Sequence, residues 1–397
     1  MKKMKKLTLV IIVLSIAFLL SCRNKENNSL ENSIEKIKIK VDSLKEIKLS
    51  KISKELSYVK LETNNNCLIG NIDKIFFHND NIFIVDKSIT NSIYKFKRNG
   101  EFIFKVSSEG KGKGGFITIN DVVFDYQNNK ILIYDNKQKK ILCFNSEDGG
   151  FIGDFSFERL FLSFRKLDTN RYLLHTNKMN NFNQDNELIE YDILLCNGEG
   201  EVLNKYFKYN PELKTDNASY DLTKVFSTYR NQTFITKLLY NKIYKMEQDY
   251  KLTPRYKVVY TGHEVPGSYQ ELPSDKLINK LTTKSDYAFA HTIRSITDKY
   301  LLFTFSYKNL KNEKWGLYNK EKKKTKIYSN VINDIDGGVF PSPVKLTDSN
   351  KLISIIEPHK EFKKIKNNKV NLSDNHPLNP NKTKKADNPI IMFAKLK

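Results

Sequence analysis

A repeating unit of short strands constrains the fold of this chain more than any other feature. The dipeptide Asn99-Gly100, which separates two apolar-polar alternating runs, is typical of a type I′ hairpin turn. Alternation with a period of two residues, broken by such turns, predicts antiparallel strands. The first copy of the unit has four such strands, at residues 74–77, 81–86, 92–96 and 101–106.

The unit recurs with a period of about 50 residues. Val85-Asp86 returns as Tyr134-Asp135. The third strand of the unit returns at 141–144, 193–196, 242–246 and 315–318. Four-stranded units at this period are typical of β-propellers. We therefore predict an all-β chain, a six-bladed β-propeller of four-stranded antiparallel blades, over residues 51–397.

Two lone strands and two insertions complete this prediction. Strands predicted at 56–61 and 390–396 lie outside the regular repeat. We expect them to complete one blade, so that strands from both termini close the ring and hide an exposed edge. Insertions are expected near 262–290 and 359–388. A pair of β-sandwiches is the alternative fold.

The N-terminus carries an export signal. Four lysines precede an apolar run at 7–20, which is shorter than the roughly 20 residues of a membrane-spanning helix. The run ends in Leu-Leu-Ser-Cys, which resembles the lipobox of bacterial lipoprotein precursors. We predict a signal peptide at 1–21, lipidation of Cys22, and a flexible tether over 22–50 with a short helix between 33 and 49. An uncleaved signal anchor is the alternative.

Charge and cysteine content exclude several classes of protein. The formal net charge is +22, but the lysines are scattered, and abundant Lys, Asn and Ile reflect AT-rich codons. We therefore expect no nucleic-acid partner. Cys67, Cys143 and Cys196 are odd in number and widely spaced, which argues against a disulfide framework and a zinc site. We expect a monomer.

Several segments carry a family resemblance. They are residues 58–63, 110–116, 333–338 and 388–391. With the strand pattern, they resemble the six-bladed β-propeller lipoproteins of Bacteroidetes, which are related in shape to NHL and TolB-like propellers. Lys113 and Gly115 stand where that family usually has Pro and Glu. The resemblance implies a fold and no established reaction. Separately, Asp42-Ser43-Leu44 resembles the acceptor motif for O-glycans on exported proteins of that group, so Ser43 is a candidate glycosylation site.

Acidic residues offer one candidate metal site. Asp334 and Asp336 are spaced like the first ligands of a calcium loop. An EF-hand is excluded, because Lys345 stands at the twelfth position, where a glutamate is needed. We expect no cofactor. The alternative is a divalent cation such as Ca²⁺ at these two residues. Aspartates that hydrogen-bond their own turn are the competing interpretation.

Four further residues are candidates for a ligand site in the central channel. His175 and His291 lie in or beside predicted strands, and Glu357 and His359 follow another. Paired-histidine zinc motifs and the Gly-x-Ser-x-Gly motif of hydrolases do not occur. For each candidate, a structural or solvated role is the favoured interpretation.

The sequence thus favours a binding or scaffolding lipoprotein. We expect it to be held in the bacterial outer membrane by lipid on Cys22, facing the periplasm or the cell surface. Its partner would be an unidentified protein, peptide or glycan. The alternative is a metal-dependent propeller hydrolase or lyase, similar to lactonases, with a site in the central channel.

Overall fold

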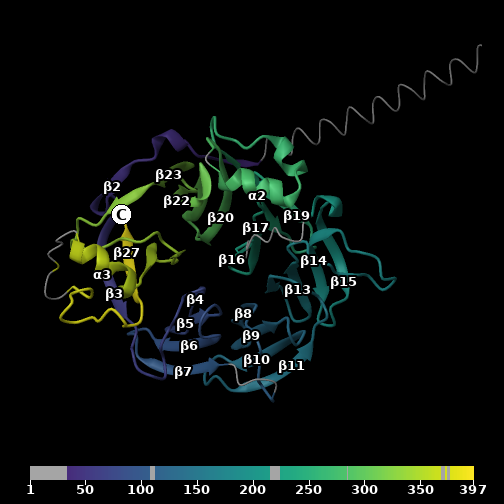
Figure 1. The fold of residues 1–397 in the computed structure, drawn as a ribbon, viewed down its shortest axis with the longest axis horizontal. Helices are drawn as coiled ribbons and strands as arrows, with labels where there is room; N and C mark the ends of the chain where they lie inside the picture. The colour runs from purple at the N-terminus through teal and green to yellow at the C-terminus, as the bar shows by residue number, and fades with distance from the viewer. Residues whose placement is uncertain (1–33, 108–111, 215–223, 284, 368–371, 373–375) are drawn as a thin grey trace, which may run out of the picture.

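The computed structural model describes residues 34–107, 112–214, 224–283, 285–367, 372 and 376–397. The predicted signal peptide and Cys22 lie outside these residues, as do parts of the second insertion. Six sheets are arranged in a ring (Figure 1), so the prediction of a six-bladed β-propeller is confirmed. Among the described residues, no helix is both long and apolar enough to cross a membrane.

The first three blades are regular four-stranded antiparallel sheets. Blade 1 contains β4 (Lys74–His78), β5 (Asn81–Asp86), β6 (Ser92–Lys97) and β7 (Phe102–Ser107). Blade 2 contains β8 (Asp121–Asp125), β9 (Lys130–Asp135), β10 (Lys140–Asn145) and β11 (Phe151–Ser156). Blade 3 contains β12 (Ser163–Lys166), β13 (Arg171–His175), β14 (Tyr191–Asn197) and β15 (Val202–Lys208).

The other three blades carry the insertions and both chain ends. Blade 4 contains β16 (Phe226–Tyr229), β17 (Gln232–Ile235), β18 (Lys242–Met246) and β19 (Leu252–Val259). Blade 5 contains β20 (Ala288–Ile296), β21 (Tyr300–Tyr307), β22 (Asn309–Asn319) and β23 (Lys324–Tyr328). Blade 6 contains β25 (Lys345–Leu346), β26 (Lys351–Ile356), β27 (Ile390–Leu396) and β3 (Ser53–Lys60), with β3 paired antiparallel to β27.

Helices and short strands occupy the connections. The predicted insertions contain η4 (Gly267–Glu271) and α2 (Ser274–Thr282) before blade 5, and α3 (Pro358–Asn367) within blade 6. The remaining elements are β1 (Glu35–Lys38), η1 (Val41–Ser43), β2 (Glu46–Lys48), η2 (Leu49–Lys51), η3 (Pro211–Leu213) and β24 (Asn330–Ile332).

Six hydrophobic clusters hold the ring together, one between each pair of neighbouring blades. Alternation explains them, because successive side chains of a strand point to opposite faces of its sheet and so enter two different clusters. In β5, for example, Phe83 and Val85 pack toward blade 2, whereas Ile82 and Ile84 pack toward blade 6. This closed arrangement gives every blade two apolar neighbours.

Polar contacts link the first strands of successive blades. Lys74 forms an ion pair with Asp121 of blade 2, and the backbone N–H of Phe164 in blade 3 donates to the same carboxylate at 2.9 Å. Ser227 Oγ of blade 4 donates to a carbonyl of blade 5 at 2.6 Å. Ser295 Oγ of blade 5 donates to a carbonyl of blade 6 at 2.8 Å. These bonds satisfy polar groups that have no strand partner across a blade boundary.

The segment 34–52 is not a flexible tether, and the predicted helix within it is wrong. We call this segment the strap. Its strand β1 pairs in parallel with β19 of blade 4, and β2 pairs with β24. Ile37, Ile39 and Val41 are at most 1 % exposed and pack into the cluster between blades 4 and 5. The strap therefore belongs to the folded domain and runs along its rim (Figure 1).

Candidate functional site

Each blade has one end at which its first strand begins and its second strand ends. We call the face of the ring formed by these ends the upper face. In blade 1 the first residue of β4, Lys74, pairs with Val85 of β5, so Asp86 ends β5 at this face. In blade 2 Asp121 pairs with Tyr134, and Asp135 follows. The repeated aspartate of the sequence therefore occupies the same place in both blades.

These two aspartates organise loops. Each is fully buried, and each carboxylate accepts hydrogen bonds from four backbone N–H groups. Asp86 accepts from Gly70, Asn71, Ile89 and Thr90. Asp135 accepts from Ile117, Thr118, Lys137 and Gln138. Because their oxygens are occupied by the chain itself, Asp86 and Asp135 have a structural role.

Blade 3 departs from this pattern at the same position. Ser163 pairs with His175, and the next residue is Thr176 in place of an aspartate. The carboxylate comes instead from Asp192, near the start of β14 and 3 % exposed. Asp192 forms an ion pair with Lys237, which follows β17 of blade 4 and is 8 % exposed. The pair joins blades 3 and 4, and we call its surroundings the junction site.

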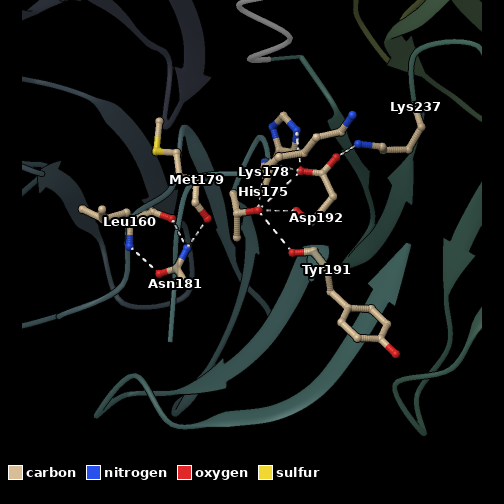
Figure 2. A network of polar contacts seen from close by, with 9 residues as sticks. Leu160, His175, Lys178, Met179, Asn181, Tyr191, Asp192 and Lys237 are labelled. Carbon is tan, nitrogen blue, oxygen red and sulfur yellow. Dashed lines mark hydrogen bonds and ion pairs between the residues drawn. The ribbon is translucent and has the colours of Figure 1, made fainter. Parts of the chain in front are cut away.

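Figure 2 shows the Asp192 carboxylate between His175, Lys178 and Lys237. The backbone N–H of Lys178 donates to Asp192 Oδ1 at 3.0 Å, and His175 Nε2 lies 3.6 Å from the same oxygen. Lys178 has φ +59°, a left-handed conformation that is uncommon for a non-glycine residue. Buried Asn181 fixes the loop by bonding the backbone of Leu160 and Met179.

Three lysines lie at or beside the junction site, and burial lowers the pKa of one of them, Lys237, to about 7. Lys178 lies with its Nζ 5.8 Å from the centre of the Tyr209 ring, and Lys214 Nζ donates to Asn180 Oδ1 at 2.8 Å. Besides burial, the positive charge of Lys178 lowers the pKa of Lys237. Burial also lowers the pKa of Lys178, again with help from a neighbouring lysine. Asp192 is the single carboxylate that contacts Lys237 among the described residues.

Some buried polar atoms of blade 3 lack a hydrogen-bond partner, as do others elsewhere in the described residues, such as Tyr229 Oη and Asn350 Oδ1. Within the described part of the chain, buried atoms without a hydrogen-bond partner include both ring nitrogens of His175, Ser163 Oγ and Tyr209 Oη. Burial holds the pKa of His175 well below its usual value, so this ring is neutral. Buried polar atoms are normally paired, and clusters of unpaired ones with shifted pKa values are typical of functional sites.

The structure places the two candidate metal ligands in separate hydrogen-bond networks. Asp334 is exposed and accepts from Ser50 N at 2.9 Å and Ser50 Oγ at 2.7 Å, which fastens the strap. Asp336 Oδ2 accepts from Tyr58 Oη at 2.5 Å. In the described residues, no group of three or more His, Cys, Asp or Glu side chains is arranged to hold a metal ion.

The surroundings of Asp336 explain the Asp-Ile-Asp-Gly-Gly segment. Asn333 Nδ2 and Gly338 N donate to Asp336 Oδ1 at 2.6 and 3.1 Å, and buried His376 lies 3.6 Å from Oδ2. Burial alone would raise the pKa of Asp336, but hydrogen bonding, with His376 and Tyr58 foremost, lowers it to about 2. A side chain on Gly338 would collide with the His376 ring. This segment therefore fastens the second insertion to blade 6.

The remaining sequence candidates do not join the junction site. His291 is 6 % exposed, and burial lowers its pKa to about 4. Its ring centre lies 6.2 Å from that of Tyr260. Glu357 and His359 do come together, at 3.5 Å, but His359 is 54 % exposed at the start of α3. Ser43 is exposed on the strap, where its hydroxyl donates to the Lys40 carbonyl. Of the predicted site residues, only His175 belongs to the junction site.

A surface depression on the opposite face is a weaker candidate. It has a volume of about 470 Å³ and is lined by Asn79, Asp80, Asn81, Lys97, Arg98, Asn99 and Ile103. Lys97 is already paired with Glu101 at 2.6 Å, and Arg98 lies over the rings of Phe77 and Phe393. The main cations of this depression therefore have partners.

Comparisons with known proteins agree with the fold. The model of a family described as a domain of unknown function, DUF4934, matches residues 34–395. A predicted exported protein from Bacteroides fragilis has a similar solved structure, with a TM-score of 0.74 and 19 % identity, covering 92 % of this chain and 100 % of that one. A DUF4221 family member from Bacteroides vulgatus has a TM-score of 0.51 and 12 % identity, covering 87 % and 97 %. None of the curated proteins matches the sequence.

Proposed function

The chain belongs to the DUF4934 family. On that premise, we propose that it is a lipid-anchored binding module that lies outside the cytoplasm and is held in the bacterial outer membrane. The basic and apolar start of the chain, followed by Ser21-Cys22, supports export and acylation. More than one acyl chain is needed for stable anchoring, which the lipoprotein pathway would supply on Cys22.

The junction site carries the proposal of a binding role. Lys178 and Lys237 contact or face the Asp192 carboxylate, Lys214 adds a further positive charge close to Lys178, and the neutral His175 ring has no hydrogen-bond partner. A ligand with a carboxylate or phosphate group would accept a hydrogen bond from Lys178, whose side chain is half-buried and so reachable from the surface. We therefore propose an acidic ligand, such as a uronate-containing glycan or an acidic peptide, at the upper face between blades 3 and 4.

Acyl labelling tests the anchor. Cells that produce the full chain would be grown with an alkyne-tagged palmitate. Label on the wild-type chain in the membrane fraction, with none on Cys22→Ala, would support the proposal. Label on both chains, or on neither, would overturn it. The same fractions, separated into inner and outer membranes, test the predicted location.

Calorimetric titration tests the ligand site. Galacturonate oligomers and inorganic phosphate would be titrated into the chain, with neutral galactose oligomers for comparison. We expect acidic probes to bind, and Lys178→Ala to weaken binding by about tenfold or more, the usual scale for losing a charged hydrogen bond. Lys208→Ala is the matched control, because Lys208 is an exposed lysine of blade 3 paired with Glu190. Equal weakening by both variants, or no binding of any acidic probe, would contradict this site.

The metal-dependent hydrolase or lyase makes a different prediction. If Asp334 and Asp336 held a divalent cation, a chelator would lower the melting temperature of the wild-type chain and leave a variant with both aspartates replaced unchanged. The binding module proposed here should melt at the same temperature with and without chelator. Melting curves on the same preparation separate the two functions.

A further inference from the structure

The strap is a row of lysines with an apolar underside. Residues 34–52 contain six lysines and three acidic residues. Ile37, Ile39 and Val41 are buried, whereas the alternating Lys36, Lys38 and Lys40 are exposed. Because side chains along an extended chain alternate in direction, burial of the isoleucines forces these lysines outward.

Each acidic residue of the strap is engaged by the propeller. Glu35 accepts from Tyr318 Oη at 2.5 Å, and Asp42 lies 3.1 Å from His263 Nε2. Glu46 accepts from Asn330 Nδ2 at 2.6 Å. By contrast, none of the six strap lysines forms an ion pair within 4 Å with a residue that the structure describes, although hydrogen bonds from Ser50 and, to a lesser degree, the charge of Lys48 lower the pKa of Asp334. The negative charges therefore hold the strap in place, and the positive charges are left for solvent or a partner.

The neighbouring blade extends this charge. Strand β1 lies against β23 as well as β19. The turn and strand at 322–326 add Lys322, Lys323, Lys324 and Lys326, all exposed. We call these four residues and the six strap lysines the basic rim. It lies on the outer edge of the propeller, beside the outermost strands of blades 4 and 5.

The chain enters the propeller at this same edge. Only eleven residues, 23–33, separate Cys22 from Ile34. Whatever their conformation, they span at most about 40 Å, since an extended chain rises by no more than about 3.6 Å per residue. A lipid attached to Cys22 therefore keeps Ile34, where the strap begins, within about 40 Å of the membrane surface, a distance that allows the basic rim to reach the headgroups.

We propose that the basic rim lies against anionic phospholipid headgroups and orients the propeller on its membrane. The proposal rests on the lipid anchoring proposed above. Each lysine near an anionic surface contributes a favourable interaction that fades within about 8–10 Å at physiological salt. In this orientation the outer edge of the propeller would face the membrane, and the upper face, with the junction site, would stay open to a ligand.

Vesicle sedimentation tests the surface without the acyl group. The chain from residue 22 onward, with Cys22→Ser, would be mixed with vesicles of phosphatidylcholine alone or with phosphatidylglycerol added. We expect binding only to the anionic vesicles, with release at high salt. The triple variant Lys36→Glu, Lys38→Glu, Lys40→Glu should bind at least about tenfold more weakly. A glutamine triple variant at the same positions should show an intermediate loss.

A charge-matched control separates the rim from the total charge of the protein. Lys105→Glu, Lys113→Glu and Lys137→Glu change exposed lysines of blades 1 and 2 and give the same net charge. We expect their binding to stay within about twofold of the parent chain. Equal loss in both triple variants, or undiminished binding by the rim variant, would overturn the proposal. Palmitate labelling is independent of these vesicle results, so a failed anchor and a failed rim are distinguishable.

Discussion

Blades 1 and 3 have the same strand pairing at the upper face and opposite chemistry. In blade 1 the buried carboxylate of Asp86 accepts hydrogen bonds from four backbone N–H groups of the neighbouring loops. In blade 3 the carboxylate is supplied by Asp192, which forms an ion pair with buried Lys237 of the next blade. The neighbouring His175 ring has no hydrogen-bond partner. A satisfied carboxylate rigidifies a fold, and the unpartnered groups of blade 3 are the observation on which the proposed ligand site rests.

The largest difference between these blades should appear on removing the carboxylate of blade 3. Asp192→Ala leaves Lys237 buried without a counter-charge, and we expect a loss of about 3–5 kcal/mol in the free energy of unfolding. Urea denaturation measures it. Replacing both partners, Asp192→Leu with Lys237→Met, should recover most of that loss. If the double variant is as unstable as the single one, the lysine is not what makes Asp192 necessary.

The equivalent change in blade 2 should lower the free energy of unfolding by somewhat less. Asp135→Ala leaves four backbone N–H groups without an acceptor, but loop movement can expose some of them to water. We expect about 3 kcal/mol, measured by the same denaturation. Asp185→Ala, an exposed aspartate in a blade 3 loop, is the control and should stay within about 0.5 kcal/mol. A cost for Asp135→Ala as small as the control would mean that its hydrogen bonds do not hold the loops.

Acid should weaken the hydrogen-bond cluster around Asp336 and so lower the free energy of unfolding. Its pKa is lowered to about 2 in the folded protein, against about 3.9 for an unfolded chain. The stabilisation is therefore complete above about pH 4 and is lost as the pH falls toward 2, by about 2 kcal/mol in all. Asp336→Asn should flatten this part of the pH–stability curve. A wild-type curve already flat between pH 4 and 2 would contradict the cluster.

The smallest effect on stability should come from His175. Blade 1 has Val85 at the paired position, and the His175 ring has no hydrogen-bond partner to lose. We expect His175→Val to change the free energy of unfolding by less than about 1 kcal/mol, because an unpaired buried polar group is itself costly. Thermal unfolding measures stability, and titration with galacturonate oligomers measures whether binding is lost. A large loss of stability would show that His175 has a structural role.

The strap shows where a correct pattern was given the wrong period. Ile34, Ile37, Val41 and Leu44 fit a helical spacing, which gave the predicted helix. The alternation of Ile37, Ile39 and Val41 with lysines was equally visible and predicts a strand. The polar and charged composition favoured a tether, although Ile37 and Ile39 between the lysines are completely buried. Both signals were present, and only packing against blades 4 and 5 decided between them.

The sequence by itself determined the propeller, because each blade is built from local hairpins whose alternation and turns lie within about 50 residues. It also determined which residues enter the cores between blades, since strand alternation assigns each side chain to a face. Only the tertiary structure decided the junction site. Asp192 and Lys237 are 45 positions apart and in different blades, and Lys237 belongs to no motif. Contacts between blades depend on how neighbouring sheets are placed, which no local pattern records.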